Sequence, residues 1–516
     1  MNSFPPRHAS ALDYLRQHAQ RHPDREAAVE GTVRLSYRDL SAQVEESASG
    51  LRAANIGPGR VVAYIGPPGI EYLITLLATF AAGATWVGLN PKYRSDELAY
   101  VIGHAQPCLV VVASKAEVRT RDELALAVAK CTTAPELVFA DSPSLRAALK
   151  GINPTSIASH PVQTDILQLG AAVLVYTSGS TGKPKGACLT QANLVENSWW
   201  LAKRANLEGG RSLINLPINH VGCIADTTLP GLLSGGTLIF MAAFDAVEAA
   251  RLIRDEKITG LGQVPTQYQM MEAAGVLNAE FLGTVKHLGW GGAAMPRSLI
   301  EYLAGFIPDL CNGYGLTECS GTVTITARGA SVEQLAGSVG VAVIDGAVRI
   351  VGANGEPVNA GESGEVQICG PHVFPGYLRN EAATRAALTA EGWLRTGDTG
   401  CWNGDGTLRL VGRMTEMYKS GGYNIYPREI EDVLESHPGV TMAAVIGVAD
   451  PLWGEAGYAF VAASPEAVDG ASLATFCREH LAAYKVPKKF EVRAELPLLP
   501  IGKIDRKKLL SLIDAT

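Results

Sequence analysis

Short apolar runs alternate with amphipathic stretches along the first part of the chain. Four of the runs are rich in β-branched residues and are bounded by turn residues, which predicts buried strands at 60–66, 108–113, 171–176 and 237–241. Between them, apolar residues recur at helical spacing, and we expect helices at 36–55 and 243–257. Strands that alternate with helices are typical of an α/β fold with mainly parallel sheets.

The pattern changes at about residue 337. Short β-type segments separated by Asn-Gly, Gly-Glu and Asp-Gly steps recur as far as 404–412, and they predict a small β-rich region over about 337–413. The final segment, 416–516, has amphipathic helical patterns at 427–436 and 471–483 that are interleaved with strands. We therefore expect a separate α+β unit at this end of the sequence.

One uncharged segment, 72–89, is nearly long enough to cross a membrane. It contains Thr75, Thr79 and an Ala-Gly-Ala step at 82–84, and it stops at Asn90 before a proline. These features favour a buried helix, a glycine turn and a short strand, because a core helix can also be apolar all round. We expect no transmembrane segment.

Composition narrows the class of protein. Hydrophobic residues make up 47% of the 516, which excludes a disordered chain. The net charge of −7 argues against nucleic-acid binding, which needs a basic face. The nine cysteines form no C-x-x-C pair, and this argues against zinc ribbons and favours free thiols. The N-terminus lacks the apolar stretch of a secretory signal, so we expect a cytoplasmic protein.

Charge is uneven along the chain. Segment 478–508 carries nine basic and four acidic residues within an acidic protein. A solvated face is the ordinary explanation for such a run, and a surface for an anionic ligand is the alternative.

The strongest chemical signal is the glycine- and hydroxyl-rich segment 176–186, directly after the predicted strand 171–176. Small residues let the backbone approach a phosphate closely, and lysines supply positive charge. The segment is not a Walker loop, because only two residues separate Gly179 from Gly182 and Pro184 follows Lys183. A flexible linker is the alternative, which the preceding buried strand disfavours.

This segment resembles the phosphate loop of the adenylate-forming superfamily, which includes acyl-CoA synthetases, peptide-synthetase adenylation domains and firefly-type luciferases. The resemblance extends from about residue 30 to 510, with the motifs in the expected order. It implies an N-terminal domain, 1–413, of two doubly wound α/β subdomains and a small β-rich subdomain. A hinge would join it to a small mobile α+β domain, 414–516. The implied ligands are ATP, Mg²⁺ and coenzyme A.

The resemblance assigns the nucleotide to several motifs. The residues implied at the β- and γ-phosphates are Thr177, Ser178, Gly179, Ser180, Thr181, Gly182 and Lys185. Those implied around adenine and the α-phosphate are Gly292, Ala293, Ala294, Asn312, Gly313, Tyr314, Gly315, Leu316 and Thr317. Tyr314 would pack on adenine, since an aromatic face suits a purine.

Three further residues complete the implied nucleotide site. Glu318 would hold Mg²⁺, because a carboxylate suits a hard cation that bridges phosphates. Asp398 would accept both ribose hydroxyls, and Arg413 would donate to the same sugar.

The resemblance also assigns roles past residue 413. Lys419, Gly421 and Gly422 would line the tunnel for the pantetheine arm, and Lys503 would bridge the substrate carboxylate and the α-phosphate. A solvated lysine is the alternative for Lys503. The hinge position departs from the family, which has Asp or Lys where this chain has Thr415. A β-branched hinge residue is stiffer, and Glu416 is a partial substitute for the lost carboxylate.

The resemblance assigns a smaller set of residues to the binding of the carboxylic acid substrate. His220 would lie near the substrate carboxylate, where peptide-synthetase domains have an Asp that pairs with an amino group, and this speaks against amino acids. An ordinary loop histidine is the alternative. The pocket candidates are His220, Val221, Cys223, Trp290, Gly291, Gly315 and Leu316. They include no Lys or Arg for a second carboxylate, so we expect a hydrophobic aryl or medium-to-long acyl monocarboxylate. Trp290 could equally be a core residue.

The implied activity is an ATP-dependent acid–CoA ligase that forms acyl-AMP, releases pyrophosphate and then forms a thioester. The implied catalytic residues are Lys503, Glu318, Thr177 and His220. The alternative is a stand-alone adenylating enzyme that stops at acyl-AMP or loads an acyl carrier protein, which we expect to be a separate chain. A homodimer is left open.

Two readings from other classes are weaker. Segment 336–340 nearly matches the A-x-S-x-G pattern of a hydrolase nucleophile, but the strand and helix that should flank it are missing. A catalytically dead homologue would not need to retain Thr177, Glu318, Asp398, Arg413 and Lys503 together.

Overall fold

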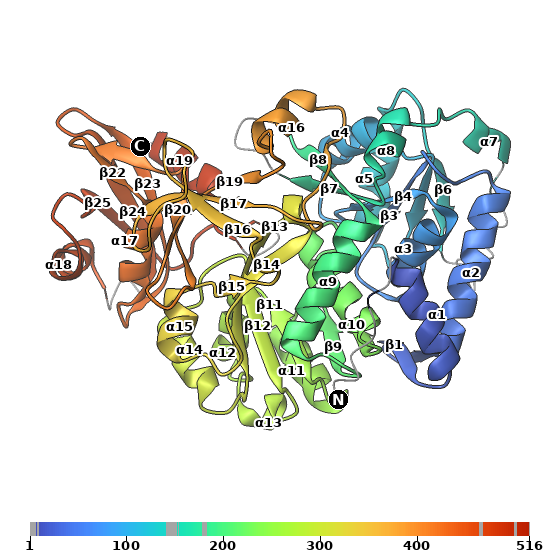
Figure 1. The fold of residues 1–516 in the computed structure, drawn as a ribbon, viewed down its shortest axis with the longest axis horizontal. Helices are drawn as coiled ribbons and strands as arrows, with labels where there is room; N and C mark the ends of the chain where they lie inside the picture. Colours follow the sequence, from blue (N-terminus) through green and yellow to red (C-terminus); the bar gives the residue numbers. More distant parts are fainter. Residues whose placement is uncertain are drawn as a thin grey trace.

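The computed structural model describes residues 7, 10–140, 152, 154–177, 183–463, 468–499 and 503–514. Its strands form four sheets. Figure 1 shows the C-terminal sheet in orange and red at one end of the molecule and helices α1 (Ala11–Arg21) and α2 (Tyr37–Ala53) in blue at the other. The expected α/β class is confirmed.

The first large sheet has seven strands in the order β18-β8-β7-β4-β3-β5-β6. The five strands β3 to β7 run parallel to one another. β8 pairs antiparallel with β7, and β18 pairs antiparallel with β8. The bounds are β3 (Val61–Ile65), β4 (Thr85–Leu89), β5 (Leu109–Val112), β6 (Glu136–Phe139), β7 (Val173–Thr177), β8 (Lys185–Leu189) and β18 (Gly376–Tyr377). The buried strands predicted at 60–66, 108–113 and 171–176 are therefore confirmed.

The second large sheet has nine strands in the order β15-β14-β13-β12-β11-β9-β10-β1-β2. Its central strands are parallel and its outer pairs are antiparallel. The bounds are β1 (Glu26–Glu30), β2 (Val33–Ser36), β9 (Arg211–Ile214), β10 (Thr237–Phe240), β11 (Gly260–Gln263), β12 (His287–Gly291), β13 (Leu310–Leu316), β14 (Gly321–Ile325) and β15 (Val341–Ala342).

Helices cover the two large sheets. The helices associated with the first are α3 (Ile70–Ala82), α4 (Ser95–Ala105), α5 (Val118–Ala129), α7 (Pro154–Ala158), α8 (Thr164–Leu169) and α16 (Glu381–Ala387). Those of the second are α9 (Gln191–Ala205), the π-helix η1 (Gly222–Thr228), α10 (Leu229–Leu233), α11 (Ala246–Asp255), α12 (Pro265–Ala273), α13 (Ala279–Leu282), α14 (Arg297–Ala304), the 3₁₀ turn η2 (Thr317–Cys319) and α15 (Val332–Gly337). Ser36 starts α2 with a capping box, which satisfies two backbone donors at the helix end.

The apolar segment 72–89 forms the predicted helix, turn and strand. Helix α3 ends at Gly83, whose φ of 72° is left-handed and favours glycine, and β4 follows. Tyr72 and Trp86 are fully buried in the core between the sheets. Within the described ranges, no helix is both long and apolar enough to span a bilayer.

Two smaller sheets complete the chain. One is antiparallel and consists of β16 (Val348–Val351), β17 (Ser363–Ile368), β19 (Leu394–Trp402) and β20 (Leu408–Arg413). The other consists of β21 (Tyr418–Ser420), β22 (Tyr423–Ile425), β23 (Val440–Asp450), β24 (Gly454–Ala463) and β25 (Lys489–Arg493), with helices α17 (Pro427–Glu435), α18 (Gly470–His480) and α19 (Arg506–Asp514). The domain boundary at 413/414 falls between these sheets and stays a prediction.

Candidate active site

A three-residue cluster joins the nine-stranded sheet to the small antiparallel sheet. Asp398 on β19 lies opposite Arg413 on β20 in the strand register. The Tyr314 hydroxyl on β13 donates to Asp398 Oδ2 at 2.6 Å, and Arg413 Nε lies 3.0 Å from Asp398 Oδ1. Burial raises the pKa of Asp398, and the Arg413 charge and the Tyr314 hydrogen bond oppose the increase. A carboxylate held in this way has lone pairs left for two ribose hydroxyls.

Lys503 reaches this cluster from the C-terminal sheet. A Cβ atom on Gly292, which follows β12, would lie 3.2 Å from Lys503 Cε. Lys503 remains exposed to solvent. Partial desolvation and the Arg413 charge lower the pKa of Lys503, and the Asp398 charge partly offsets this, so the three charges lie near one another. The Leu499 N–H donates to the Lys503 carbonyl at 2.7 Å, and this bond helps to hold the backbone of the lysine. Ala293 and Ala294 are exposed beside Gly292.

Glu318 lies in a second polar cluster. The Tyr377 hydroxyl donates to Glu318 Oε1 at 2.7 Å, and Lys185 Nζ lies 5.2 Å from the centre of the Tyr377 ring. Lys185 pairs with Thr177 across the β7–β8 hairpin. This hairpin carries the predicted phosphate loop, so Glu318 lies close to the expected phosphates.

The Glu318 carboxylate suits Mg²⁺ that arrives with a nucleotide. No ion pair engages it among the described residues, and its second oxygen is available to a cation. Mg²⁺ usually binds one or two carboxylates together with substrate phosphates and water. No group of three or more candidate ligands gathers anywhere in the described part of the chain.

Part of the predicted phosphate loop lies outside the described residues. This part comprises Ser178, Gly179, Ser180, Thr181 and Gly182. The end of the loop is anchored, because the Tyr100 hydroxyl donates to the Pro184 carbonyl at 2.7 Å and Lys183 Nζ lies 5.5 Å from the Tyr100 ring centre.

The segment 312–317 has mixed roles. Asn312 Nδ2 donates to the carbonyls of Leu335 and Ser338, so its side chain fastens a neighbouring loop. Gly315 is sterically required, since a Cβ there would lie 1.8 Å from the Gly321 carbonyl oxygen. Gly313 and Leu316 are partly exposed on β13, and Thr317 begins η2.

The predicted acid pocket divides into two groups. His220, Val221 and Gly291 are partly exposed. Cys223 is fully buried, with Sγ 3.9 Å from the Tyr72 hydroxyl, and Trp290 is 4% exposed in a separate core cluster. The structure therefore directs Cys223 and Trp290 into the hydrophobic core and leaves the first group beside the cleft.

His220 is linked electrostatically to the reacting end of this cleft. Burial and, to a smaller extent, the Lys503 charge lower the pKa of His220 to about 4. The ring is therefore neutral near pH 7, where it can accept or donate one hydrogen bond without adding charge.

This pKa predicts how acid affects stability. The unfolded histidine binds a proton near its ordinary pKa of 6.5, whereas the folded protein binds it only near 4. The unfolded state then carries more protons between these values, so His220 lowers stability as the pH falls through this window. We expect urea unfolding of His220→Gln to show a smaller loss of stability than wild type between about pH 7 and about pH 5. An equal loss of stability in the variant and the wild type would contradict this role of His220.

The predicted pantetheine residues lie in and beside a surface turn. Gly421 and Gly422 form the turn between β21 and β22 with φ values of 57° and 86°, which favour glycine. Both are exposed, and Gly421 packs against Trp453 of the same sheet. Lys419 is also exposed, and its N–H donates to Glu455. The structure thus brings Lys503 to the nucleotide cluster and leaves the glycine turn on the surface.

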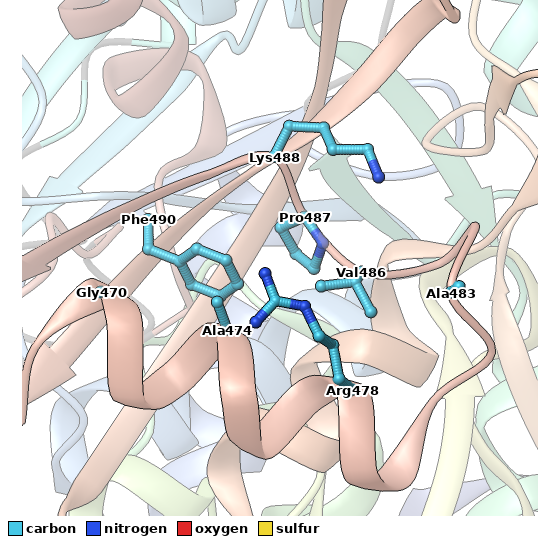
Figure 2. A pocket seen from close by; sticks show the side chains of 8 residues that line it. All are labelled: Gly470, Ala474, Arg478, Ala483, Val486, Pro487, Lys488 and Phe490. Atoms are coloured by element: carbon cyan, nitrogen blue, oxygen red, sulfur yellow. The ribbon is translucent and has the colours of Figure 1, made fainter.

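A cavity of about 550 Å³ lies in the same C-terminal unit (Figure 2). Helix α18 contributes Ala474 and Arg478, and the chain before β25 contributes Val486 and Pro487. Figure 2 shows the Arg478 guanidinium directed between these segments. Lys488 borders the cavity, and its Nζ lies 5.1 Å from the ring centre of Trp453, which packs on the glycine turn.

The sequence analysis missed Tyr377 and Tyr100, which orient Glu318 and the loop end. Both are single tyrosines in ordinary contexts, so no local signal marks them. It also missed Asp226, a partly exposed acidic residue in η1 that lies only six positions after His220.

Comparison with known proteins agrees with this geometry. The AMP-binding enzyme family matches residues 15–378, and the AMP-binding enzyme C-terminal domain matches residues 429–503. The chain belongs to the AMP-binding enzyme family. It is 37% identical over 490 residues to a feruloyl-CoA synthase of Amycolatopsis sp, covering 94% of this chain and 95% of that protein.

Two further proteins extend the comparison. The chain is 33% identical to a 2-succinylbenzoate–CoA ligase of Bacillus licheniformis, with 96% of this chain and 99% of the relative covered. The crystal structure of ATP-bound MatB from Rhodopseudomonas palustris has a TM-score of 0.85 and 27% identity, with 98% and 99% covered.

Proposed function

We propose that this protein is an AMP-forming acid–CoA ligase that activates a hydrophobic, preferably aryl, carboxylate with ATP. The observation that carries the proposal is the approach of Lys503 to Gly292, Asp398 and His220, four residues from distant parts of the chain. The family and the CoA ligases among its members support it. The carrier-protein alternative is not favoured, because these full-length relatives act with CoA.

The first half-reaction makes the acid reactive. A carboxylate is a poor acyl electrophile because an oxide or hydroxide would have to leave. Attack of the carboxylate oxygen on the α-phosphorus of ATP breaks the bond to pyrophosphate and forms acyl-AMP, from which AMP leaves readily. Lys503 would neutralise the two anionic reactants, Asp398 and Arg413 would hold the ribose, and Thr177 and Lys185 would flank the phosphates. Mg²⁺ at Glu318 supplies charge neutralisation on the phosphates.

The second half-reaction requires a different arrangement of the chain. The CoA thiol would attack the acyl carbon and displace AMP, and the Gly421–Gly422 turn would have to approach the cleft. A rotation about Thr415, in the turn after β20, would withdraw Lys503 and bring the glycine turn in. In the present arrangement Glu416 Oε2 lies 3.5 Å from Arg506 Nε, a contact that this rotation would change.

The acceptor is tested directly. Enzyme is incubated with Mg²⁺, ATP, an aryl acid and CoA, and free acyl-CoA is measured by mass spectrometry. We expect the thioester, with AMP and pyrophosphate as products. Acyl-AMP without thioester would instead support the stand-alone adenylating enzyme. A panel of acids assayed by pyrophosphate release identifies the substrate, and preference for an amino acid or a dicarboxylate would overturn the proposed acid class.

Thr415→Pro tests the hinge. Within the described residues the Thr415 N–H has no hydrogen-bond partner, so proline removes none, but it fixes φ and restricts Met414. We expect pyrophosphate exchange to stay near the wild-type rate and thioester formation to slow about tenfold, equivalent to about 1.4 kcal/mol. Thr415→Ser is the matched control. Equal slowing of both half-reactions would contradict a hinge role.

All nine cysteines are free thiols in the structure. Because free thiols persist in reducing compartments, they support a cytoplasmic location.

A further inference from the structure

Asp226 is a carboxylate in η1 that has no cationic partner. The Thr322 N–H donates to its Oδ1 at 2.9 Å, and no Lys, Arg or His of the described residues forms an ion pair with it. The residue keeps some solvent exposure. Desolvation of its carboxylate raises the pKa of Asp226 to about 6, and hydrogen bonds from the backbone and the side chain of Thr322 oppose this in part. It is therefore mainly ionised near pH 7. The Thr322 N–H and side chain fill only part of the acceptor capacity of a carboxylate, so Asp226 has room for a further donor.

Asp226 lies one turn beyond the residues at the reacting end of the acid pocket. His220 and Val221 precede it by six and five positions, a separation of about 9 Å at most along a helix. Residue Gly222 has no side chain, and a Cβ there would lie 3.7 Å from Asp226 Oδ2, the oxygen that the Thr322 N–H does not engage. The helix is of the π type, which often occurs at functional sites.

The hairpin of β13 and β14 carries predicted pocket residues and contacts the same carboxylate. Thr322 on β14 pairs with Gly315 on β13, one of the predicted pocket residues. Gly321 has a φ of 110°, and a Cβ on it would lie 2.4 Å from Asp226 Oδ1. Glycines at 315 and 321 therefore let the hairpin close on Asp226, and the carboxylate lies where the two walls meet.

We propose that Asp226 forms the far end of the acid pocket and selects an aryl acid that carries a hydroxyl group opposite its carboxylate. The hydroxyl donates to Asp226 Oδ2. An aryl ring on a short side chain spans the distance between His220 and Asp226. A purely apolar acid would cover the carboxylate without supplying a donor, and a second carboxylate would be repelled. This inference rests on the proposed function and names the substrate class of the same site.

The test compares 4-hydroxycinnamate with cinnamate and 4-methoxycinnamate, which lack the donor but keep the ring. Pyrophosphate release gives kcat/KM for each acid without CoA. For wild type we expect a preference for the hydroxylated acid of about 10- to 100-fold, the range for a hydrogen bond to a charged group. Asp226→Leu should bring the ratio to about 1 or below, and Asp226→Asn, which keeps an acceptor, should lie between.

The outcomes separate this role from two others. If Asp226 only supports the hairpin through Thr322, Asp226→Leu lowers kcat/KM equally for all three acids and lowers the melting temperature, which overturns the proposal. Equal wild-type activity on all three acids overturns it while the ligase assignment stands. If only aliphatic acids are adenylated, both the aryl substrate and the role of Asp226 are overturned. If no acid is adenylated, the proposed function itself fails.

Discussion

Lys503→Ala is expected to lower acid-dependent pyrophosphate exchange by about 10²- to 10³-fold, the cost typical of removing one preorganised charge-stabilising group. Lys503 lies beside Gly292 and shares its cleft with Asp398 and Arg413. The rate of isotope exchange between pyrophosphate and ATP measures this step directly.

The control for this substitution is Lys507→Ala. Lys507 is exposed on α19, four positions away, and the change removes the same charge from the same basic segment. We expect it to leave exchange unchanged. Thioester formation from purified acyl-AMP should survive in Lys503→Ala, because the lysine acts only in the first half-reaction. Undiminished exchange in Lys503→Ala would eliminate its catalytic role.

Gly422→Leu should impair the second half-reaction and spare the first, the reverse of the effect expected for Lys503→Ala. Gly422 is exposed on the surface turn, and a Cβ on it would have no atom within 4 Å in the present arrangement. We expect normal pyrophosphate exchange and a loss of thioester formation of about 10²-fold, a cost typical of misplacing a reactant by about 1 Å. Stopped reactions should contain acyl-AMP that persists in the presence of CoA.

Gly422→Ala controls for backbone strain. Both substitutions place an L-residue at a φ of 86° and therefore carry a similar penalty of about 1–2 kcal/mol. Only leucine adds bulk where the pantetheine arm would pass, so alanine should retain most of the thioester activity. Equal losses in the two variants would assign the effect to strain, and loss of exchange would place the turn in the first half-reaction.

Several elements followed from the sequence because their causes are local. The segment 72–89 was predicted as a helix, a glycine turn and a strand, and it forms α3, Gly83 and β4. The left-handed preference of glycine determines the end of this helix without distant contacts. The motif residues Asp398 and Arg413 were also predicted together, and strand pairing places them 3.0 Å apart.

Side-chain direction within the acid pocket did not follow from the sequence. Cys223 and Trp290 were pocket candidates by position, yet both are buried in hydrophobic clusters. η1 is a π-helix, and its residues therefore share faces differently from those of an α-helix. A short stretch of sequence does not reveal which of the two helix types forms. η1 also places the Asp226 carboxylate against the Thr322 N–H, and no sequence motif indicated this contact.

The sequence by itself determined the α/β class, the order of the nucleotide motifs and the residue types available for phosphate, ribose and metal. Only the tertiary structure decided which of them meet. Tyr377 reaches Glu318 across 59 positions, and Lys503 reaches Gly292 across 211. Such contacts depend on how sheets pack against each other, which is determined by the summed burial of many side chains rather than by any short segment.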